Sequence, residues 1–161
     1  MNPMNRLPRI SSAMGFLAMC ILLISLSTAA GWSQNPATSP KTFVLTIHVE
    51  NVNKDAGNVG MLVFNSSVGW PESRFVALKD IVVPAHPGTV TITVPDLPPG
   101  DYAVAILHDV NKNHKMDKNF FGMPKEQWGM SNNPHATIKA PSFDTAKFSL
   151  SENMEIHVRM Q

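Results

Sequence analysis

Apolar residues recur at every second position over much of the chain beyond residue 40, which is the pattern of a β-strand with one buried face. The first and clearest run carries large apolar residues at Phe43, Leu45, Ile47 and Val49. Six further runs of strand length follow, most of them separated by turn-forming residues. They span residues 59–65, 74–84, 89–94, 101–108, 143–150 and 154–160. The pattern therefore predicts seven strands.

Seven short strands, with no long helical pattern after the N-terminal region, predict an all-β fold. We expect a seven-stranded antiparallel sandwich of two sheets with Greek-key connections. One connection is unusual, because the segment from Asp109 to Ser142 is far longer than an ordinary hairpin loop. The aromatic and methionine side chains of this segment predict one long ordered loop that folds onto the sandwich.

The first 30 residues have the composition of a cleaved secretory signal peptide. Arg6 and Arg9 precede a short apolar run at residues 13–26, and small residues follow at 27–30. The apolar run is shorter than the roughly 20 residues that a spanning helix needs. We therefore predict cleavage; the alternatives are an uncleaved anchor and a lipid attached at Cys20.

This N-terminal pattern divides the chain into a signal peptide at residues 1–30, a flexible leader at 31–40 and a β-sandwich domain at 41–161. The leader is polar and holds two prolines, Pro36 and Pro40. The protein is expected to be exported, either to the periplasm or outside the cell, with no membrane span after cleavage.

Removal of the signal peptide changes the charge and the cysteine count. Lys plus Arg falls from 13 to 11 because Arg6 and Arg9 leave, while Asp plus Glu stays at 12, so the formal net charge becomes −1. This balance does not indicate a nucleic-acid or an anionic-membrane partner. The single cysteine also leaves, which excludes a disulfide and a thiol nucleophile in the exported domain.

Oxygen-bearing side chains stand at alternate positions where the long loop begins. Asp109, Asn111, Asn113 and Asp117 occupy the first, third, fifth and ninth places of an EF-hand-like calcium loop, and the Lys115 carbonyl takes the seventh. Two positions depart from that pattern. His114 stands where glycine normally permits the sharp turn, and Phe120 stands where a bidentate Glu belongs, so Glu126 or a backbone carbonyl would have to substitute.

The spacing therefore predicts a weak calcium site, since only two of the four alternating side chains are charged. The main alternative is an Asx-rich turn, in which Asp and Asn side chains bond their own backbone. Binding of another metal is a further alternative. No other cofactor is expected.

The chain resembles a bacterial family catalogued as domain of unknown function 2141. The shared motifs are Leu97–Ala103, His108–Asp109, the residues at 111, 113 and 117, Gly122–Glu126, Gly129, Ser131–Asn133 and Pro141–Phe148. His114 stands where that family usually has glycine, and Trp128 and Met130 flank Gly129 where tyrosine and phenylalanine are commoner. The resemblance covers residues 43–160 and implies an exported sandwich of immunoglobulin-like or transthyretin-like type, without implying an activity.

Other chemistry has weaker support in the sequence. Six histidines and ten methionines suggest copper, but no His-x-His or Met-x-x-Met cluster occurs beyond residue 30, so scattered surface histidines and core methionines are the better interpretation. Ser131, His135 and Asp144 can be drawn as a hydrolytic triad, but no nucleophile elbow surrounds the serine. We predict that the protein is not an enzyme.

Two hypotheses for function follow. The first is a non-catalytic binding or accessory module of the cell envelope, with an envelope or extracellular partner that the sequence does not identify. The second is a small-ligand carrier in which Phe120, Phe121 and Trp128 form one wall of a pocket. A concave apolar surface around Trp128 would favour the carrier, and a flat, filled surface would favour the module.

Overall fold

The computed structural model describes residues 40–135 and 139–161. The predicted signal peptide and nearly all of the predicted leader lie outside the described residues. The described elements belong to a compact unit that spans Thr38–Gln161. Both sheets and both hydrophobic clusters of this unit lie between residues 43 and 160, so residues 31–161 contain the whole described fold.

The described residues form an all-β unit of two sheets with one short helix. The elements are β1 (Phe43–Val52), β2 (Asn58–Phe64), β3 (Lys79–Pro84), β4 (Gly88–Leu97), β5 (Gly100–Asp109), β6 (Trp128–Met130), α1 (Phe143–Ala146), β7 (Phe148–Leu150) and β8 (Met154–Arg159). No helix among these residues is both long and apolar enough to cross a bilayer.

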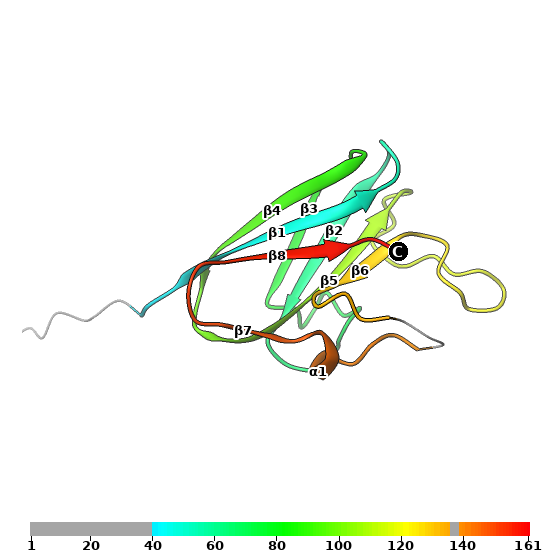
Figure 1. Ribbon diagram of the computed structural model, residues 1–161. Helices are drawn as coiled ribbons and strands as arrows, with labels where there is room; N and C mark the ends of the chain where they lie inside the picture. The colour runs from blue at the N-terminus through cyan, green and yellow to red at the C-terminus, as the bar shows by residue number, and fades with distance from the viewer. Residues whose placement is uncertain (1–39, 136–138) are drawn as a thin grey trace, which may run out of the picture. The chain divides into compact units, whose positions relative to one another are not determined.

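The first sheet has the strand order β4-β1-β8. β1 pairs antiparallel with β4 and parallel with β8. The alternation that predicted β1 also orients it, because Leu45, Ile47 and Val49 are fully buried. Figure 1 shows β4, β1 and β8 side by side, in front of the strands of the second sheet.

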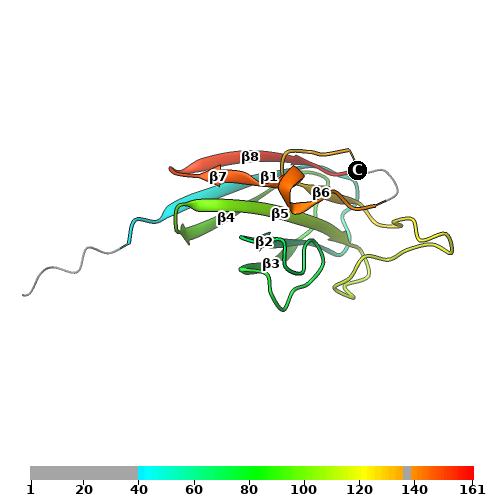
Figure 2. The same ribbon diagram turned by 90° about the horizontal axis from the view of Figure 1, so that it is seen from below.

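The second sheet has the order β3-β2-β5-β6. β7 pairs with the first residues of β5, Gly100–Tyr102, whereas β6 pairs farther along at Ala105–Leu107. Figure 2 shows β2 and β3 on the side of β5 away from β8 and β1. The main core fills the space between the two sheets and includes Tyr102, whose predicted burial is confirmed.

A smaller cluster lies beside α1 and contains Phe64, Ala103, Met130, Phe143 and Ala146. Trp70 packs edge-on against two of these rings, Phe64 and Phe143, with centroids 5.4 and 6.0 Å away. Its indole N–H donates to the carbonyl of Pro141 at 2.9 Å. Trp70 therefore anchors the connection between β2 and β3 to the body of the sheet.

The all-β, two-sheet prediction is confirmed, but three details of the predicted strands are wrong. The described residues hold eight strands rather than seven. Strand β6 lies inside the segment that was expected to be loop, because a three-residue strand is too short to produce a recognisable alternation. The sandwich is also not purely antiparallel, because β8 runs parallel to β1.

The predicted strand at residues 143–150 is the third difference. Residues Phe143–Ala146 form a helical turn that is capped by Ser142, whose side chain accepts the N–H of Thr145. A serine before the first turn is a preferred helix start, and it outweighs the apolar alternation there. Only Phe148–Leu150 remains a strand.

Candidate functional site

The long connection between β5 and β6 begins with a buried carboxylate. Asp109 closes β5 with its side chain 3% exposed, and its two oxygens accept the backbone N–H groups of Asn113 and His114 at 3.0 and 2.8 Å. The turn needs left-handed backbone at Lys112 (φ 62°) and at His114 (φ 63°). The sixth position of the calcium-like pattern therefore has the backbone that favours glycine, although histidine occupies it.

Asn111, Asn113 and Asp117 complete a closed network within this turn. The amide groups of Asn111 and Asn113 donate to the two oxygens of Asp117 at 2.7 and 2.9 Å. Their own carbonyl oxygens accept backbone N–H groups two residues ahead, from Asn113 at 3.1 Å and Lys115 at 3.0 Å. These bonds are Asx turns, so the alternative interpretation of the spacing accounts directly for this geometry.

Glu126 joins the two ends of the same turn. Its carboxylate oxygens accept the N–H of Val110 at 3.0 Å and of Asp117 at 3.1 Å. The sequence placed Glu126 next to this turn, and the structure does bring it there. No group of three Asp, Glu, His or Cys side chains in the described residues is arranged to hold a metal ion. The side chains predicted to bind calcium are gathered, but their hydrogen bonds are made to one another and to the backbone.

The turn between β1 and β2 supports the start of the long loop. His108, fully buried, places Nε2 2.9 Å from the carbonyl of Ala56 and Nδ1 3.4 Å from Oε1 of Gln127. Gly57 (φ 76°) packs so closely against the backbone of Asp109 and Val110 that no side chain would fit there. These contacts fix the position of Asp109 relative to the sheet.

A groove of ≈ 620 Å³ lies on the outer face of the second sheet, away from the core. Two rows of paired residues cross its floor from β3 to β6. One row is Val82, Gly60, Leu107 and Trp128, and the other is Asp80, Leu62, Ala105 and Met130. Gly60 and Ala105 are small, so the floor is hollow where the central strands meet. A Cβ built on Gly60 would meet no atom closer than 3.9 Å.

Two connections form the walls of the groove. The β2–β3 connection contributes Pro71, Glu72 and Arg74, and the long loop contributes residues between His114 and Pro124, including Met116 and Met123. Lys118 of the long loop lies 3.4 Å from Glu72, so an ion pair links the two walls. The groove has a volume within the range of small-molecule sites, and its floor is mainly apolar.

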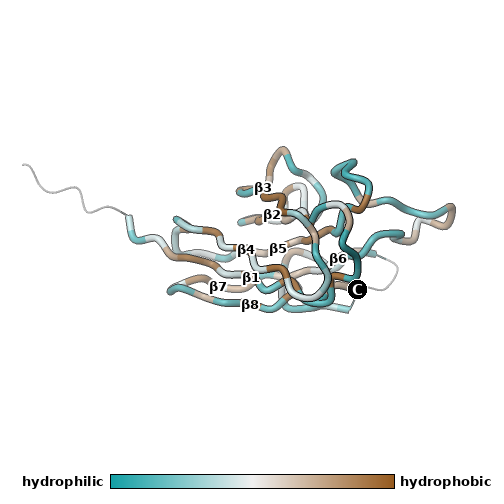
Figure 3. The backbone as a smooth tube through the Cα atoms, turned by 90° about the horizontal axis from the view of Figure 1, so that it is seen from above, coloured by the Kyte–Doolittle hydropathy of each residue, from teal (hydrophilic) through white to brown (hydrophobic). Residues whose placement is uncertain are grey.

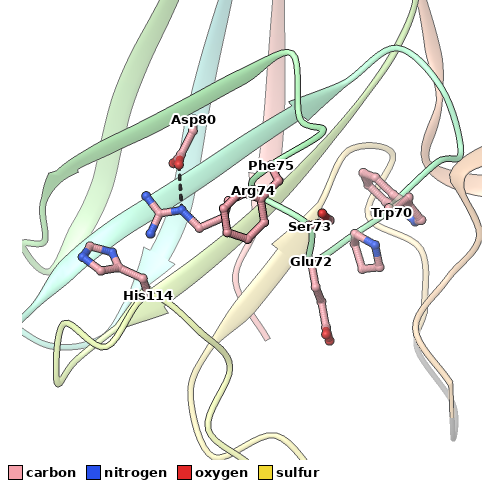
Figure 4. Close-up of a pocket in the computed structure, with 9 residues that line it drawn as sticks. Trp70, Glu72, Ser73, Arg74, Phe75, Asp80 and His114 are labelled. Carbon is pink, nitrogen blue, oxygen red and sulfur yellow. Dashed lines mark hydrogen bonds and ion pairs between the residues drawn. The ribbon is translucent and has the colours of Figure 1, made fainter.

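A second hollow of ≈ 810 Å³ adjoins the groove at the β2–β3 connection and shares Arg74, Asp80 and His114 with it. Figure 4 shows the guanidinium of Arg74 directed at Asp80, with His114 approaching from the long loop. The Arg74 Nε to Asp80 Oδ2 distance is 2.6 Å. This pair neutralises both charges at the mouth of the groove.

The remaining charges at the groove are mainly positive. Glu72 is paired with Lys118, Asp80 is paired with Arg74, and Asp109 is held by backbone N–H groups. Lys115 and Lys139 also line the groove. In the part of the chain that the structure describes, neither has a carboxylate within 4.0 Å.

The residues predicted for an aromatic pocket wall separate in the structure. Trp128 lines the groove, whereas Phe120 and Phe121 lie outside it and are 98% and 84% exposed. The expectation that the whole loop folds onto the sandwich therefore holds for the β6 end and not for these two rings. The sequence did not single out Gly60, Leu62, Val82, Ala105 and Leu107 as functional. The sequence feature that could have identified these groove residues is that β2 and β5 are apolar on both faces, not only on the face that meets the core.

The residues considered for a hydrolytic triad do not come together in the structure. Ser131 is buried, donates to the carbonyl of Ala146 at 2.7 Å and accepts the N–H of Val104 at 2.9 Å. Asp144 accepts from Lys147. Among the described residues, Ser131, His135 and Asp144 make no hydrogen bond to one another.

Of the histidines considered for copper, the structure brings one pair together and places His108 elsewhere. His48 and His157 stack on the outer face of the first sheet with ring centroids 4.8 Å apart. Each faces a carboxylate, Glu155 at 3.2 Å and Glu50 at 2.8 Å. His108, in contrast, is buried behind the long loop.

Comparison with known proteins gives one match. The profile of a family described as uncharacterized proteins conserved in bacteria (DUF2141) matches residues 47–157, which include both the Asp109 turn and all of the residues that line the groove. Neither the curated proteins nor the solved structures gave a significant match. Since the matched region covers more than half of the chain, this protein belongs to the DUF2141 family.

Proposed function

We propose that this protein is an exported, non-catalytic binding module that carries a small amphipathic ligand in the groove on its second sheet. The observation that carries the proposal is the hollow, apolar floor formed by two residue rows beside Trp128. An apolar outer face is unusual for a two-sheet sandwich, in which that face normally meets water and is polar. A concave surface around Trp128 is also what distinguishes a carrier from a module with a flat surface.

The charges at the groove indicate the class of ligand. An apolar body would replace water over Leu62, Leu107 and Trp128, where burial is favourable. An anionic head would lie near Lys115 or Lys139, which are not neutralised by neighbouring carboxylates within the described residues. A ligand with one apolar end and one carboxylate, sulfonate or phosphate end satisfies both requirements.

The proposal can be tested with a substitution that places a larger side chain on the floor of the groove. Gly60→Val adds a β-branched side chain that suits a strand and, from the position of the Cβ, has room to fit. Anilinonaphthalene sulfonate, which combines an aromatic body with an anion, serves as the fluorescent probe, and dodecanoate as the competitor. We expect Gly60→Val to weaken probe binding by about tenfold or more. Thr93→Val, on the exposed outer face of the first sheet, is the matched control and should bind as wild type does.

Equal probe affinity in wild type and Gly60→Val would exclude the groove as the binding site. Retention of bound probe in the presence of excess dodecanoate would exclude the proposed ligand class. The thermal melting of Gly60→Val should be measured in parallel, because only a folded variant reports on the groove.

A second proposal, supported by the burial of Asp109, is that the Asp109–Asp117 turn binds calcium weakly. Burial of a carboxylate without a cation is costly, and Asp109 has only neutral backbone donors and the half-exposed His114 ring 3.9 Å away. Calcium binding would require Asn111 and Asn113 to turn their amide groups away from Asp117 and present carbonyl oxygens. Loss of those two hydrogen bonds would keep the affinity low.

We also infer that the sandwich has Greek-key connections of the immunoglobulin-like or transthyretin-like type. The strand orders β4-β1-β8 and β3-β2-β5-β6 support this, since consecutive strands change sheet between β1 and β2 and between β3 and β4. Export to the periplasm or the medium is proposed from the N-terminal sequence pattern. Intact-mass measurement of the exported protein should find a chain that begins near Ala30 or Gly31, and a mass that includes Met1 would contradict export by cleavage.

A further inference from the structure

The tip of the long loop is a small hairpin held by its own hydrogen bonds. Lys118 and Pro124 form a β-bridge, and Asn119 donates its N–H to the carbonyl of Met123 at 2.9 Å. The Asn119 side chain accepts the N–H groups of Phe121 and Met123 at 2.9 and 3.0 Å. Gly122 (φ 78°) supplies the left-handed residue that closes the turn. The polar groups of the tip are therefore largely used within the tip itself.

This hairpin tip exposes two aromatic rings to solvent. Phe120 and Phe121 are 98% and 84% exposed and contact each other edge-on, with ring centroids 5.5 Å apart. Met123 beside them is 54% exposed. Figures 2 and 3 show the tip projecting away from both sheets, and Figure 3 shows its apolar colouring among hydrophilic neighbours. Single exposed apolar residues are common on proteins, but a clustered exposed group points to an interaction site.

A third exposed aromatic residue lies on the connection that the Lys118–Glu72 ion pair joins to this loop. Phe75 is fully exposed, and Val76 next to it is 49% exposed. Both connections border the same groove. Exposed apolar side chains are thus found on both of the connections that border the groove.

The 110–125 loop carries more positive than negative charge, although the 68% exposed carboxylate of Glu72 pairs with Lys118. Lys112, Lys115, Lys118 and Lys125 are all exposed, whereas Asp117, the only carboxylate in residues 110–125, is held by the two asparagines. Four lysines against one aspartate give this segment a net charge of +3, although residues 31–161 have a net charge of −1. The net charge of residues 31–161 did not indicate an anionic-membrane partner, but the concentration of lysines in residues 110–125 does.

We propose that the 110–125 loop docks this protein onto an anionic lipid bilayer, with Phe120 and Phe121 inserted at the level of the headgroups and the surrounding lysines against the lipid phosphates. Phenylalanine is among the apolar residues that membrane-binding segments bury at the boundary between headgroups and acyl chains, and nearby basic residues are attracted to anionic lipids. A protein partner fits less well, because a stable protein interface takes roughly 20–30 residues on each side, whereas the hairpin tip between Lys118 and Pro124 is much shorter. A bilayer accepts a narrow tip without a complementary shape.

Docking on a bilayer does not depend on the ligand proposed for the groove, and vesicle binding is measured separately from probe binding. Residues 31–161 are mixed with vesicles of phosphatidylcholine, with or without roughly one part in four of phosphatidylglycerol, and the bound fraction is measured by co-sedimentation. Wild type should bind the anionic vesicles. Phe120→Ser/Phe121→Ser should lower the partition coefficient by about tenfold or more, because the buried apolar area is lost.

The lysines are tested by a charge-matched pair of variants. Lys112→Gln/Lys125→Gln should lower binding to anionic vesicles by roughly fivefold for each charge removed and leave binding to pure phosphatidylcholine unchanged. Lys41→Gln/Lys147→Gln removes the same charge at positions just before β1 and β7, outside the 110–125 loop, and should bind as wild type does. Gly60→Val, which fills the groove, should also leave vesicle binding unchanged.

Three results would overturn the proposal. The first is a wild-type domain that does not sediment with anionic vesicles. The second is a Phe120→Ser/Phe121→Ser variant that binds them as tightly as wild type does. The third is an equal loss of binding in both lysine pairs, since that would place the contact elsewhere on the molecule. Because the two phenylalanines are exposed, their replacement should leave thermal melting unchanged, so loss of binding would not reflect unfolding.

Discussion

Glu126 accepts the backbone N–H of Asp117 at 3.1 Å with one carboxylate oxygen, while its other oxygen accepts the N–H of Val110. One side chain near the end of the long loop therefore closes the turn at the loop's beginning. The two backbone groups are seven residues apart, so Glu126 clamps both ends of the Asp109 turn.

Glu126→Ala should destabilise the protein. Both N–H groups lose a charged acceptor, and a hydrogen bond to a charged group contributes about 1.5–3 kcal/mol when it is protected from water. Since Glu126 is partly exposed, we expect a loss of about 1–3 kcal/mol in the free energy of unfolding, measured by urea denaturation. Glu126→Gln keeps one acceptor oxygen and should lose less. Faster hydrogen exchange at Val110 and Asp117 in Glu126→Ala should accompany the loss, and unchanged exchange there would contradict the clamp.

Calcium should raise the melting temperature if the Asp109 turn binds it. A site of the weak extracellular class has a dissociation constant on the order of 10⁻⁴–10⁻³ M, so about 5 mM calcium would stabilise the folded state by roughly 1–2.3 kcal/mol. For a domain of this size the melting temperature should rise by about 3–10 °C. Magnesium should do much less, because it requires tighter octahedral geometry.

Two variants separate calcium binding from an Asx turn. Asp109→Ala should remove the calcium response. Asn111→Asp replaces an amide that donates to Asp117 with a second carboxylate, so it should lower stability in chelator and be rescued by calcium. If the turn is only structural, Asp109→Ala would cost about 1 kcal/mol or more in either buffer, and the wild type would melt at one temperature with or without calcium.

Tyr102→Ala should be strongly destabilising. The ring is 4% exposed in the main core, and truncation of a buried aromatic residue costs roughly 3–5 kcal/mol. Tyr102→Phe keeps the ring and removes only the hydroxyl, which donates to the carbonyl of Pro98 at 2.8 Å. It should cost about 1 kcal/mol. Equal losses from the two substitutions would show that the ring does not contribute through packing.

Stability should fall in strong alkali because of the same residue. Burial raises the pKa of the Tyr102 phenol above its usual value of 10.0, since the charged phenolate is disfavoured there. The unfolded chain therefore loses this proton at lower pH than the folded chain does. The stabilising contribution is fully present below about pH 10 and is lost as the pH rises through the pKa of the folded state. Tyr102→Phe should show a smaller loss between neutral and alkaline pH in denaturant titrations, and an identical loss would contradict the assignment.

Most strands were predictable because each has one buried face. In β1 the alternation of Phe43 to Val49 indicated both the strand and its orientation, since a pleated strand places every second side chain on one side. The same local reasoning failed at Phe143–Ala146, where a helix cap at Ser142 has no period of two, and at β6, which is too short to show one.

The sequence by itself determined the all-β class, the family and the hydrogen-bonding potential of the Asp109 turn, because strand alternation and Asx turns depend on residues close together in the chain. Tertiary structure alone decided which sheet each strand joined, including the parallel pairing of β8 with β1. It also decided that Gly60, Leu107 and Trp128 form one floor, while Phe120 and Phe121 remain in solvent. The physical reason is that a groove arises from strand register and from the packing of distant connections, which local patterns do not encode.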